Sequence, residues 1–273
     1  MARKRKKKDS LLLRIMLGVG CGVLLCALMA VIFYPRGEQP NATTKPAPPT
    51  VAPNPYDAAD FAYNGLFLEC LAGESRPGID VSSHQGRIDW PRVREAGVEF
   101  VFVRLGYRGY ETGVLHEDVY ARTNLAEARK AGLQVGAYFF SQALNEHEAR
   151  DEAAFALKVL DGFVLDLPLV YDWEYVSEEA RTGKTTKQEL MVCVNAYCGA
   201  VEQAGYAPMV YFNRYLAQSH LELEKLTQYP FWLAMYTDQM TYQYRVDFWQ
   251  YSDKGRIPGI EADVDLNIWM MDA

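Results

Sequence analysis

The chain of 273 residues predicts an α/β fold, a TIM-like barrel of eight strands that begins near residue 78. Short apolar segments first alternate with amphipathic helical segments, which favours a parallel sheet covered by helices. Three more apolar segments then follow closely between residues 231 and 269, with no room for full helices between the last ones. We therefore expect a barrel whose last third lacks its helices, preceded by one transmembrane helix and a Pro-rich linker.

The first 34 residues predict a membrane anchor. Residues 1–10 are rich in Lys and Arg, which is typical of a cytoplasmic tail, and the run from Ile15 to Tyr34 has no charged residue and is long enough to cross a bilayer. We expect residues 11–34 to be a signal-anchor in contact with the lipid bilayer, with the rest of the chain exported. A cleaved signal peptide is the alternative, because the small residues from Ala27 to Ala30 provide a cleavage site.

Residues 35–75 are predicted to be a linker, because Pro, Ala and Thr dominate from Pro35 to about Tyr63 without helical or strand periodicity. The whole chain has a net charge of −7, and residues 1–34 contribute +6 (seven basic residues and one acidic residue), so the rest carries −13. This acidity argues against nucleic acid as a partner. The spacing of Cys and His suggests no zinc site, and we expect no metal and no cofactor.

Residues 76–273 are predicted to form the folded domain. Asp89 is a candidate N-cap for the first helix, which has a proline in its first turn. Helical segments are expected at 89–97, 119–132, 145–160 and 186–205, followed by a short helical piece after residue 213. The expected strands are 78–82, 99–107, 134–141, 168–176, 207–213, 231–236, 247–251 and 263–269.

The strand at 168–176 carries two carboxylates separated by one residue. Because side chains alternate along a strand, Asp172 and Glu174 are expected on one side and Trp173 on the other. Close carboxylates repel, which raises the pKa of at least one of them and leaves an acid beside a base near neutral pH. Cleavage of a glycosidic bond needs such a pair. The same spacing also occurs where a strand simply ends in solvated acids, so the pair alone does not identify a catalytic site, and other residues must distinguish the two interpretations.

In a barrel of this type, functional side chains gather at the C-terminal ends of the strands. We expect polar and aromatic residues near these ends to line one site, although aromatic residues in strands also serve as core. These residues are Asp80, Tyr107, Tyr138, Phe140, Asp172, Glu174, Tyr211, Asn213, Tyr236, Trp249, Gln250, Asp263 and Asp265.

Six motifs, taken in order, resemble glycoside hydrolase family 25, the muramidases (lysozymes) of bacteria and phages. They are GIDVSSHQG, YDWE, YFN, WLAMY, WQY and VDLN, and the similarity covers about residue 78 to the C-terminus. The resemblance implies a (β/α)5β3 barrel. It also implies cleavage of the β-1,4 bond between N-acetylmuramic acid and N-acetylglucosamine in peptidoglycan.

The resemblance further implies roles for four acids. Glu174 matches the general acid, Asp172 its partner carboxylate, Asp80 the acid of the opening motif and Asp265 the late aspartate, with Asp263 close by as an alternative. Phe139 and Phe140 follow Tyr138 where a histidine is common in the family, which affects the sugar subsites and not the reaction. The expected substrate-binding residues are Tyr107, Tyr138, Tyr211, Asn213, Tyr236, Trp249, Gln250 and Asp263.

The residues themselves suggest a mechanism. Glu174, kept protonated by its acidic neighbours, donates a proton to the leaving oxygen. Asp172 has three possible tasks: to attack the sugar, to activate water, or to stabilise the charged ring that forms when the 2-acetamido group of the substrate attacks. The spacing of the two acids does not choose between them. The family resemblance favours net retention with participation of the acetamido group.

The predicted function is hydrolysis of peptidoglycan by an enzyme held on the wall side of a bacterial cell membrane, for remodelling of the cell's own wall. Its partners are then the glycan strands of peptidoglycan, and the sequence identifies no protein partner. Two alternatives stay open at this point. One is an inactive module that binds wall glycan on the same fold. The other is a hydrolase of a different N-acetylhexosamine polymer such as chitin.

Overall fold

The computed structural model describes residues 50–271. The predicted cytoplasmic tail, the signal-anchor at 11–34 and the linker up to residue 49 lie outside these residues. Within residues 50–271, the structure contains no helix with the length and hydropathy that a membrane span requires.

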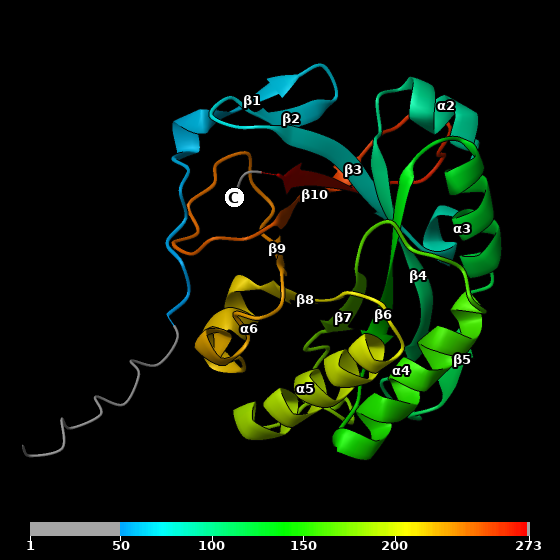
Figure 1. Ribbon diagram of the computed structural model, residues 1–273, viewed down its shortest axis with the longest axis vertical. Helices are drawn as coiled ribbons and strands as arrows, with labels where there is room; N and C mark the ends of the chain where they lie inside the picture. Colours follow the sequence, from blue (N-terminus) through cyan, green and yellow to red (C-terminus); the bar gives the residue numbers. More distant parts are fainter. Residues whose placement is uncertain (1–49, 272–273) are drawn as a thin grey trace, which may run out of the picture. The chain divides into compact units, whose positions relative to one another are not determined.

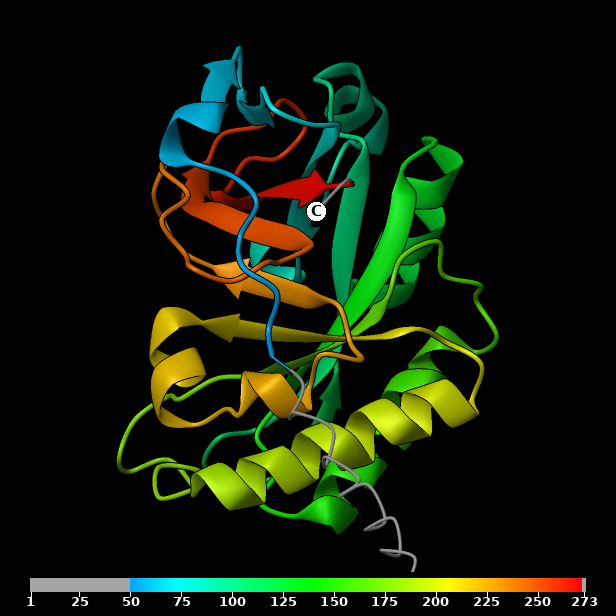
Figure 2. The ribbon, with the colours of Figure 1, turned by 60° about the vertical axis from the view of Figure 1, so that its left-hand side comes forward.

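Eight strands close a barrel in the order β3–β4–β6–β7–β8–β9–β10–β11, and β11 pairs back with β3 (Figures 1 and 2). The prediction of an eight-stranded barrel is therefore confirmed. A short strand, β5 (Leu115–Glu117), extends the sheet by pairing with the end of β4. The barrel strands are β3 (Ser75–Val81), β4 (Phe100–Arg108), β6 (Gln134–Ser141), β7 (Leu169–Trp173), β8 (Pro208–Asn213), β9 (Phe231–Ala234), β10 (Phe248–Gly255) and β11 (Val264–Met270).

The last strand corrects the expectation of an all-parallel barrel. Strand β11 is antiparallel to both of its neighbours, β10 and β3, whereas the other pairs around the barrel are parallel. Only residues 256–263 join β10 to β11, and such a short connection returns the chain antiparallel because a parallel return needs a longer crossover. The beginning of β11 therefore lies beside the C-terminal ends of the other strands.

Helices cover the outside of the barrel near the first five strands, as expected. Asp89 caps the first of them, because its Oδ1 accepts a hydrogen bond from the Arg92 amide at 3.3 Å. Thr186 and Glu189 form a capping box at the start of α5, and α4 lies beside α5 (Figures 1 and 2). The α-helices are α2 (Trp90–Glu95), α3 (Ala121–Lys130), α4 (Glu146–Leu160), α5 (Lys187–Gln203) and α6 (Arg214–Ser219). The 3-10 helices are η1 (Ala58–Asp60), η2 (Ser83–Gln85) and η3 (Leu223–Lys225).

A hairpin covers strands near the end of the barrel, where the helices are missing. It consists of β1 (Phe61–Asn64) and β2 (Phe67–Cys70), which pair antiparallel. The Phe61 ring packs edge-on against Trp249 with 5.2 Å between ring centroids. The Leu68 amide donates a hydrogen bond to the Tyr251 hydroxyl at 3.2 Å. The prediction of a linker as far as residue 75 is therefore wrong for this part of the chain. The outward-facing side chains of β10 need an apolar cover, and the hairpin supplies it.

The interior of the barrel has a core of its own, separate from the core beneath the helices. Gly78 and Gly136 make room in it, because a Cβ at either position would lie 2.3 Å from the ring of Phe100 or Phe102. This interior core forms the floor beneath the C-terminal ends of the strands. It consists of Phe100, Phe102, Tyr138, Leu167, Val170, Met209, Tyr211, Trp232, Ala234 and Phe248.

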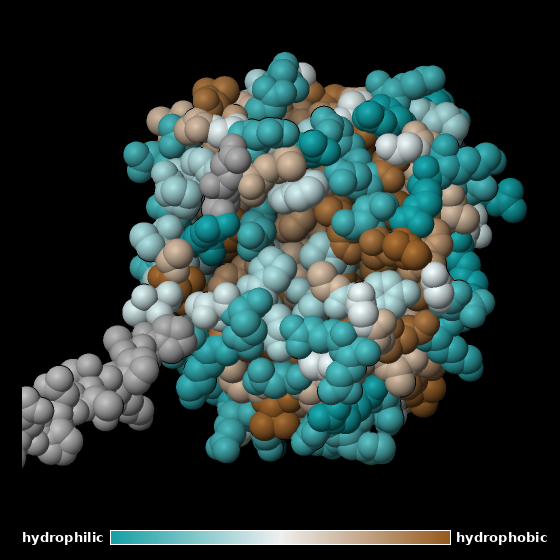
Figure 3. All heavy atoms as spheres, in the orientation of Figure 1, coloured by the Kyte–Doolittle hydropathy of each residue, from teal (hydrophilic) through white to brown (hydrophobic). Residues whose placement is uncertain are grey.

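The outer surface differs from both cores. Hydrophilic side chains cover most of the face seen in Figure 3.

Candidate active site

Strand alternation brings three of the four predicted acids to one end of the barrel. Asp80 on β3 lies directly opposite Asp265 on β11 in the strand register, and Asp172 follows Val170 of the interior core on β7. Glu174 comes one residue after the end of β7. All four line a cavity of about 210 Å³. Its other lining residues are Ser82, His84, Gln85, Arg104, Tyr138, Phe140, Tyr211, Trp232, Tyr236 and Gln250.

Two side-chain amides hold Asp80. Its Oδ2 accepts hydrogen bonds from Gln250 Nε2 and from Asn267 Nδ2, both at 2.8 Å. Asn267 is fixed in turn, because its Oδ1 accepts a hydrogen bond from Trp232 Nε1 at 2.8 Å. Burial raises the pKa of Asp80 to about 6, while the two amide donors hold it down.

The other three acids have less support from donors. Asp172 is 5% exposed, and its Oδ1 has no hydrogen-bond partner among residues 50–271. Burial, followed by the charge of Glu174, raises the pKa of Asp172 well above its ordinary value. Burial and the charge of Asp80 also raise the pKa of Glu174. Burial and the charges of Asp80 and Asp253 raise the pKa of Asp265 to about 9. Burial and mutual repulsion therefore raise the pKa of all four acids, and Asp265, with a pKa of about 9, retains its proton at neutral pH.

Arg104 is the one guanidinium or ammonium group among the residues that line the cavity. Its Nε and Nη2 atoms lie 2.9 and 2.8 Å from Asp118 Oδ2, and its Nη2 also donates to Ser83 Oγ at 3.0 Å. Asp118 is buried and also accepts a hydrogen bond from the Ser83 amide. The negative charge of Asp118 therefore offsets much of the attraction that Arg104 would otherwise exert on the four acids.

Aromatic side chains form the floor and one wall of the cavity. Trp232 stacks on Phe102 at 4.7 Å between ring centroids, and Tyr211 meets Trp232 edge-on at 4.9 Å. The hydroxyls of Tyr211 and Tyr236 donate to Gln250 Oε1 at 3.0 and 3.1 Å. Tyr236 is 56% exposed, so its ring lies at the open side of the cavity. Apolar ring faces beside fixed polar groups are what a sugar-binding site offers.

Four predicted substrate-binding residues do not line the cavity. The prediction for Trp249 is wrong, because it lies fully buried on the outer side of β10, where its Nε1 donates to the Met235 carbonyl at 2.8 Å. Asn213 caps α6, Asp263 pairs with Arg256 at 2.7 Å, and Tyr107 stacks on His116 at 5.0 Å.

Trp232, Asn267 and Asp118 are site residues that the sequence reasoning missed. The two-residue alternation of strands was the available signal for two of them. It places Asn267 on the same side as Asp265, and Trp232 on the same side as Ala234 of the interior core. It also shows that Trp249 and Gln250, as neighbours, cannot both face the interior. For Asp118, which comes just after β5, the sequence offers no such signal.

The site contains the elements of acid–base chemistry on a sugar. Within the part of the chain that the structure describes, no group of three or more His, Cys, Asp or Glu side chains is placed to hold a metal ion. Glu174 and Asp172 place two carboxyl groups in the cavity from the end of β7, and Asp80 and Asp265 place two more from β3 and β11.

Comparison with known proteins decides the family. The model of glycosyl hydrolases family 25 matches residues 79–260, which include Asp80, Asp172 and Glu174. The chain belongs to this family. The expected resemblance is thereby confirmed, and a glycoside hydrolase is the class of enzyme that the cavity fits.

Relatives in family 25 include lysozymes. The chain is 33% identical over 206 residues to YegX of Escherichia coli K12, covering 70% of this chain and 68% of YegX. It is 27% identical to lysozyme M1 of Streptomyces globisporus, covering 70% of this chain and 66% of that lysozyme. The autolysin LytC of Streptococcus pneumoniae, solved with a synthetic peptidoglycan ligand, is 28% identical with a TM-score of 0.64. That match covers 72% of this chain and 47% of LytC, so the chain spans about half of LytC.

Proposed function

We propose that the chain is a membrane-anchored N-acetylmuramidase that cleaves the β-1,4 bond between N-acetylmuramic acid and N-acetylglucosamine in peptidoglycan. The observation that carries this proposal is the gathering of Glu174, Asp172, Asp80 and Asp265 around one cavity at the C-terminal end of a family 25 barrel. The lysozymes among its relatives and the peptidoglycan ligand bound by LytC support the choice of substrate.

In this proposal, Glu174 donates its proton to the glycosidic oxygen as the bond from that oxygen to C1 breaks. The carbonyl oxygen of the substrate's own 2-acetamido group attacks C1 from the opposite face and forms a cyclic intermediate. Asp172 Oδ1, which has no protein partner in the described chain, accepts the N–H of that group. Water then opens the intermediate at C1 while Glu174 takes its proton. Two displacements at C1 give net retention.

The anchor places this chemistry on the cell's own wall. Residues 11–34 cross the membrane in this proposal, with the basic residues 1–10 inside the cell and the acidic remainder outside. Attachment to the membrane raises the effective concentration of the domain near peptidoglycan without a tight binding site. Remodelling of self peptidoglycan is then the natural role.

The test is to incubate the purified full-length chain with peptidoglycan and to identify the new reducing ends by mass spectrometry. We expect muramic acid at the reducing end. Glu174→Gln should lower the rate by about 10² to 10⁴, the contribution of a general acid. The matched control is Glu179→Gln, an exposed acid in the following loop, which should keep the wild-type rate. Reducing ends of N-acetylglucosamine, equal cleavage of chitin, or full activity of Glu174→Gln would contradict the proposal.

A further inference from the structure

The backbone carbonyl of Glu174 is held by a side chain at the end of the barrel sheet. The last register pair between β6 and β7 joins Ser141 and Trp173, so Glu174 lies one residue beyond the ladder. Its carbonyl oxygen accepts a hydrogen bond from Gln142 Nε2 at 2.8 Å. Gln142 is the residue that follows β6, and it is fully buried.

Every polar group of Gln142 is engaged. Its Nε2 also donates to the Ser141 carbonyl at 2.9 Å, and its Oε1 accepts from Thr182 Oγ1 at 2.5 Å. Its amide donates to Glu152 Oε1 at 3.2 Å, and its carbonyl accepts from Arg181 Nη1 at 2.6 Å. A fully bonded amide side chain has one orientation, so the carbonyl of Glu174 meets a fixed donor.

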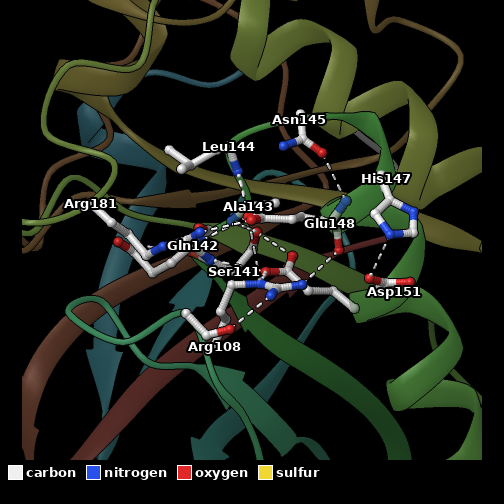
Figure 4. Close-up of polar contacts among 12 residues, drawn as sticks. Arg108, Ser141, Gln142, Ala143, Leu144, Asn145, His147, Glu148, Asp151 and Arg181 are labelled. Carbon is white, nitrogen blue, oxygen red and sulfur yellow. Dashed lines mark hydrogen bonds and ion pairs between the residues drawn. The ribbon is translucent and has the colours of Figure 1, made fainter.

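Gln142 itself rests on a network of ion pairs that is buried at Arg108 and Glu152 and partly buried at Arg181 and Glu148 (Figure 4). Arg108 Nε donates to Glu152 Oε1 at 2.7 Å, and Arg181 binds both carboxylate oxygens of Glu148 at 2.7 Å. Arg108 and Glu148 are also joined, because Arg108 Nη2 donates to the Glu148 carbonyl at 2.9 Å. This Arg108 network ties β4, α4 and the loop after β7 together around Gln142.

We propose that Gln142 is a positioning residue for Glu174: it fixes the backbone from which the catalytic carboxyl group projects into the cavity. The inference rests on the proposed muramidase function only for its effect on rate. Gln142 does not line the cavity and touches no reacting atom. Proton donation depends steeply on placement, since a misplacement of about 1 Å can cost about 10² in rate.

The test compares two full-length variants that disturb Gln142 differently. Gln142→Met keeps the length of the side chain but removes the donor to Glu174. Thr182→Val removes the donor to Gln142 Oε1 and leaves the contact with Glu174 in place, so it controls for lost stability. For each variant, kcat and KM are measured on soluble strands of alternating N-acetylglucosamine and N-acetylmuramic acid. Thermal unfolding and the titration of the Glu174 carboxyl group by ¹³C NMR are also followed.

We expect Gln142→Met to lower kcat by about 10- to 100-fold, with KM changed less than about threefold. We also expect the Glu174 titration midpoint to fall towards that of an exposed glutamate, because a displaced carboxyl group leaves its buried site beside Asp80. Thr182→Val should leave the titration midpoint unchanged and lower kcat by less than about threefold, at a comparable loss of melting temperature.

Two results would overturn the inference. One is a Gln142→Met variant with wild-type kcat and an unchanged titration midpoint. The other is equal effects of both variants on kcat and on the midpoint, which would make the role of Gln142 merely structural. If the wild type does not cleave the strands, the proposed function fails, and the Glu174 titration in the same two variants still decides whether Gln142 places that carboxyl group.

Discussion

The cavity and the Arg108 network both contain buried carboxyl groups, but they surround them differently. Glu152, in the network, is fully buried and accepts hydrogen bonds from Arg108, from Ser141 Oγ at 2.5 Å and from the Gln142 amide. Asp172, in the cavity, is almost as buried, yet its Oδ1 has no partner in the described chain. Burial raises the pKa of both groups, to about 7 for Glu152.

The two sites differ in the neighbouring groups, which either counteract or reinforce the effect of burial on the pKa. Around Glu152, the Arg108 guanidinium and the Ser141 hydroxyl lower the pKa that burial raises. Around Asp172, the charges of Glu174 and Asp80 raise the pKa further, and Arg104 opposes them only in part. The network therefore uses its acids to hold the structure together. The cavity instead places carboxyl groups beside one another, which raises their pKa values further and makes the fold less stable as the pH rises.

The largest stability effect is expected from removing the cation of the network. Arg108→Met leaves Glu152 buried without a charged partner, which should lower the free energy of unfolding by about 3 to 5 kcal/mol. Denaturant unfolding measures this change. Arg122→Met is the control, because the pair of Arg122 with Glu117 is exposed to solvent and should contribute much less to stability. Equal losses in the two variants would show that the network is no more important to stability than a surface ion pair.

Removing an acid from the cavity should instead raise the stability of the fold. Asp265→Asn removes an acid whose pKa is raised to about 9, while its amide can still donate to Asp80. The folded wild type holds an extra proton between the unfolded pKa of about 3.9 and about 9, so its stability falls as pH rises through this range. The variant lacks this loss, which by these pKa values reaches about 4 kcal/mol at pH 7, and should be more stable than the wild type there.

Thermal unfolding of Asp265→Asn from pH 4 to pH 9 checks this expectation. Its advantage over the wild type should grow with pH, while its rate of glycan cleavage falls. Asp263→Asn is the control, because Asp263 pairs with Arg256 outside the cavity. A variant less stable than the wild type at pH 8 would mean that Asp265 supports the fold, and the contrast with the network would fail.

The sequence predicted the barrel and the convergence of Asp80, Asp172, Glu174 and Asp265, because the strand pattern and the motifs are local signals. Two errors arose where tertiary packing decides. The hairpin residues around Phe61 looked like part of the linker, since their role is to cover strands far along the chain. Trp249 faces that hairpin and not the cavity. The alternation of side chains next to Gln250 contained this information.

The Arg108 network could not be predicted from the sequence. Arg108 and Glu152 are 44 residues apart, and neither lies in a sequence motif that predicts the pairing. Their pairing depends on how α4 packs outside β4 and β6, which is a property of the folded barrel. Gln142 was missed for the same reason, because its contact with Glu174 joins the ends of two neighbouring strands across 32 residues.

The most direct test of this account is the titration of the Glu174 carboxyl group by site-resolved ¹³C NMR, in the wild type and in Asp80→Asn. We expect a midpoint clearly above the value of about 4.3 for an ordinary glutamate, because burial and the charge of Asp80 raise the pKa of Glu174. We also expect the midpoint to fall in Asp80→Asn. A Glu174 midpoint equal to that of an ordinary glutamate would show that the cavity does not raise the pKa of Glu174, and the proposed role of Glu174 as proton donor would be contradicted.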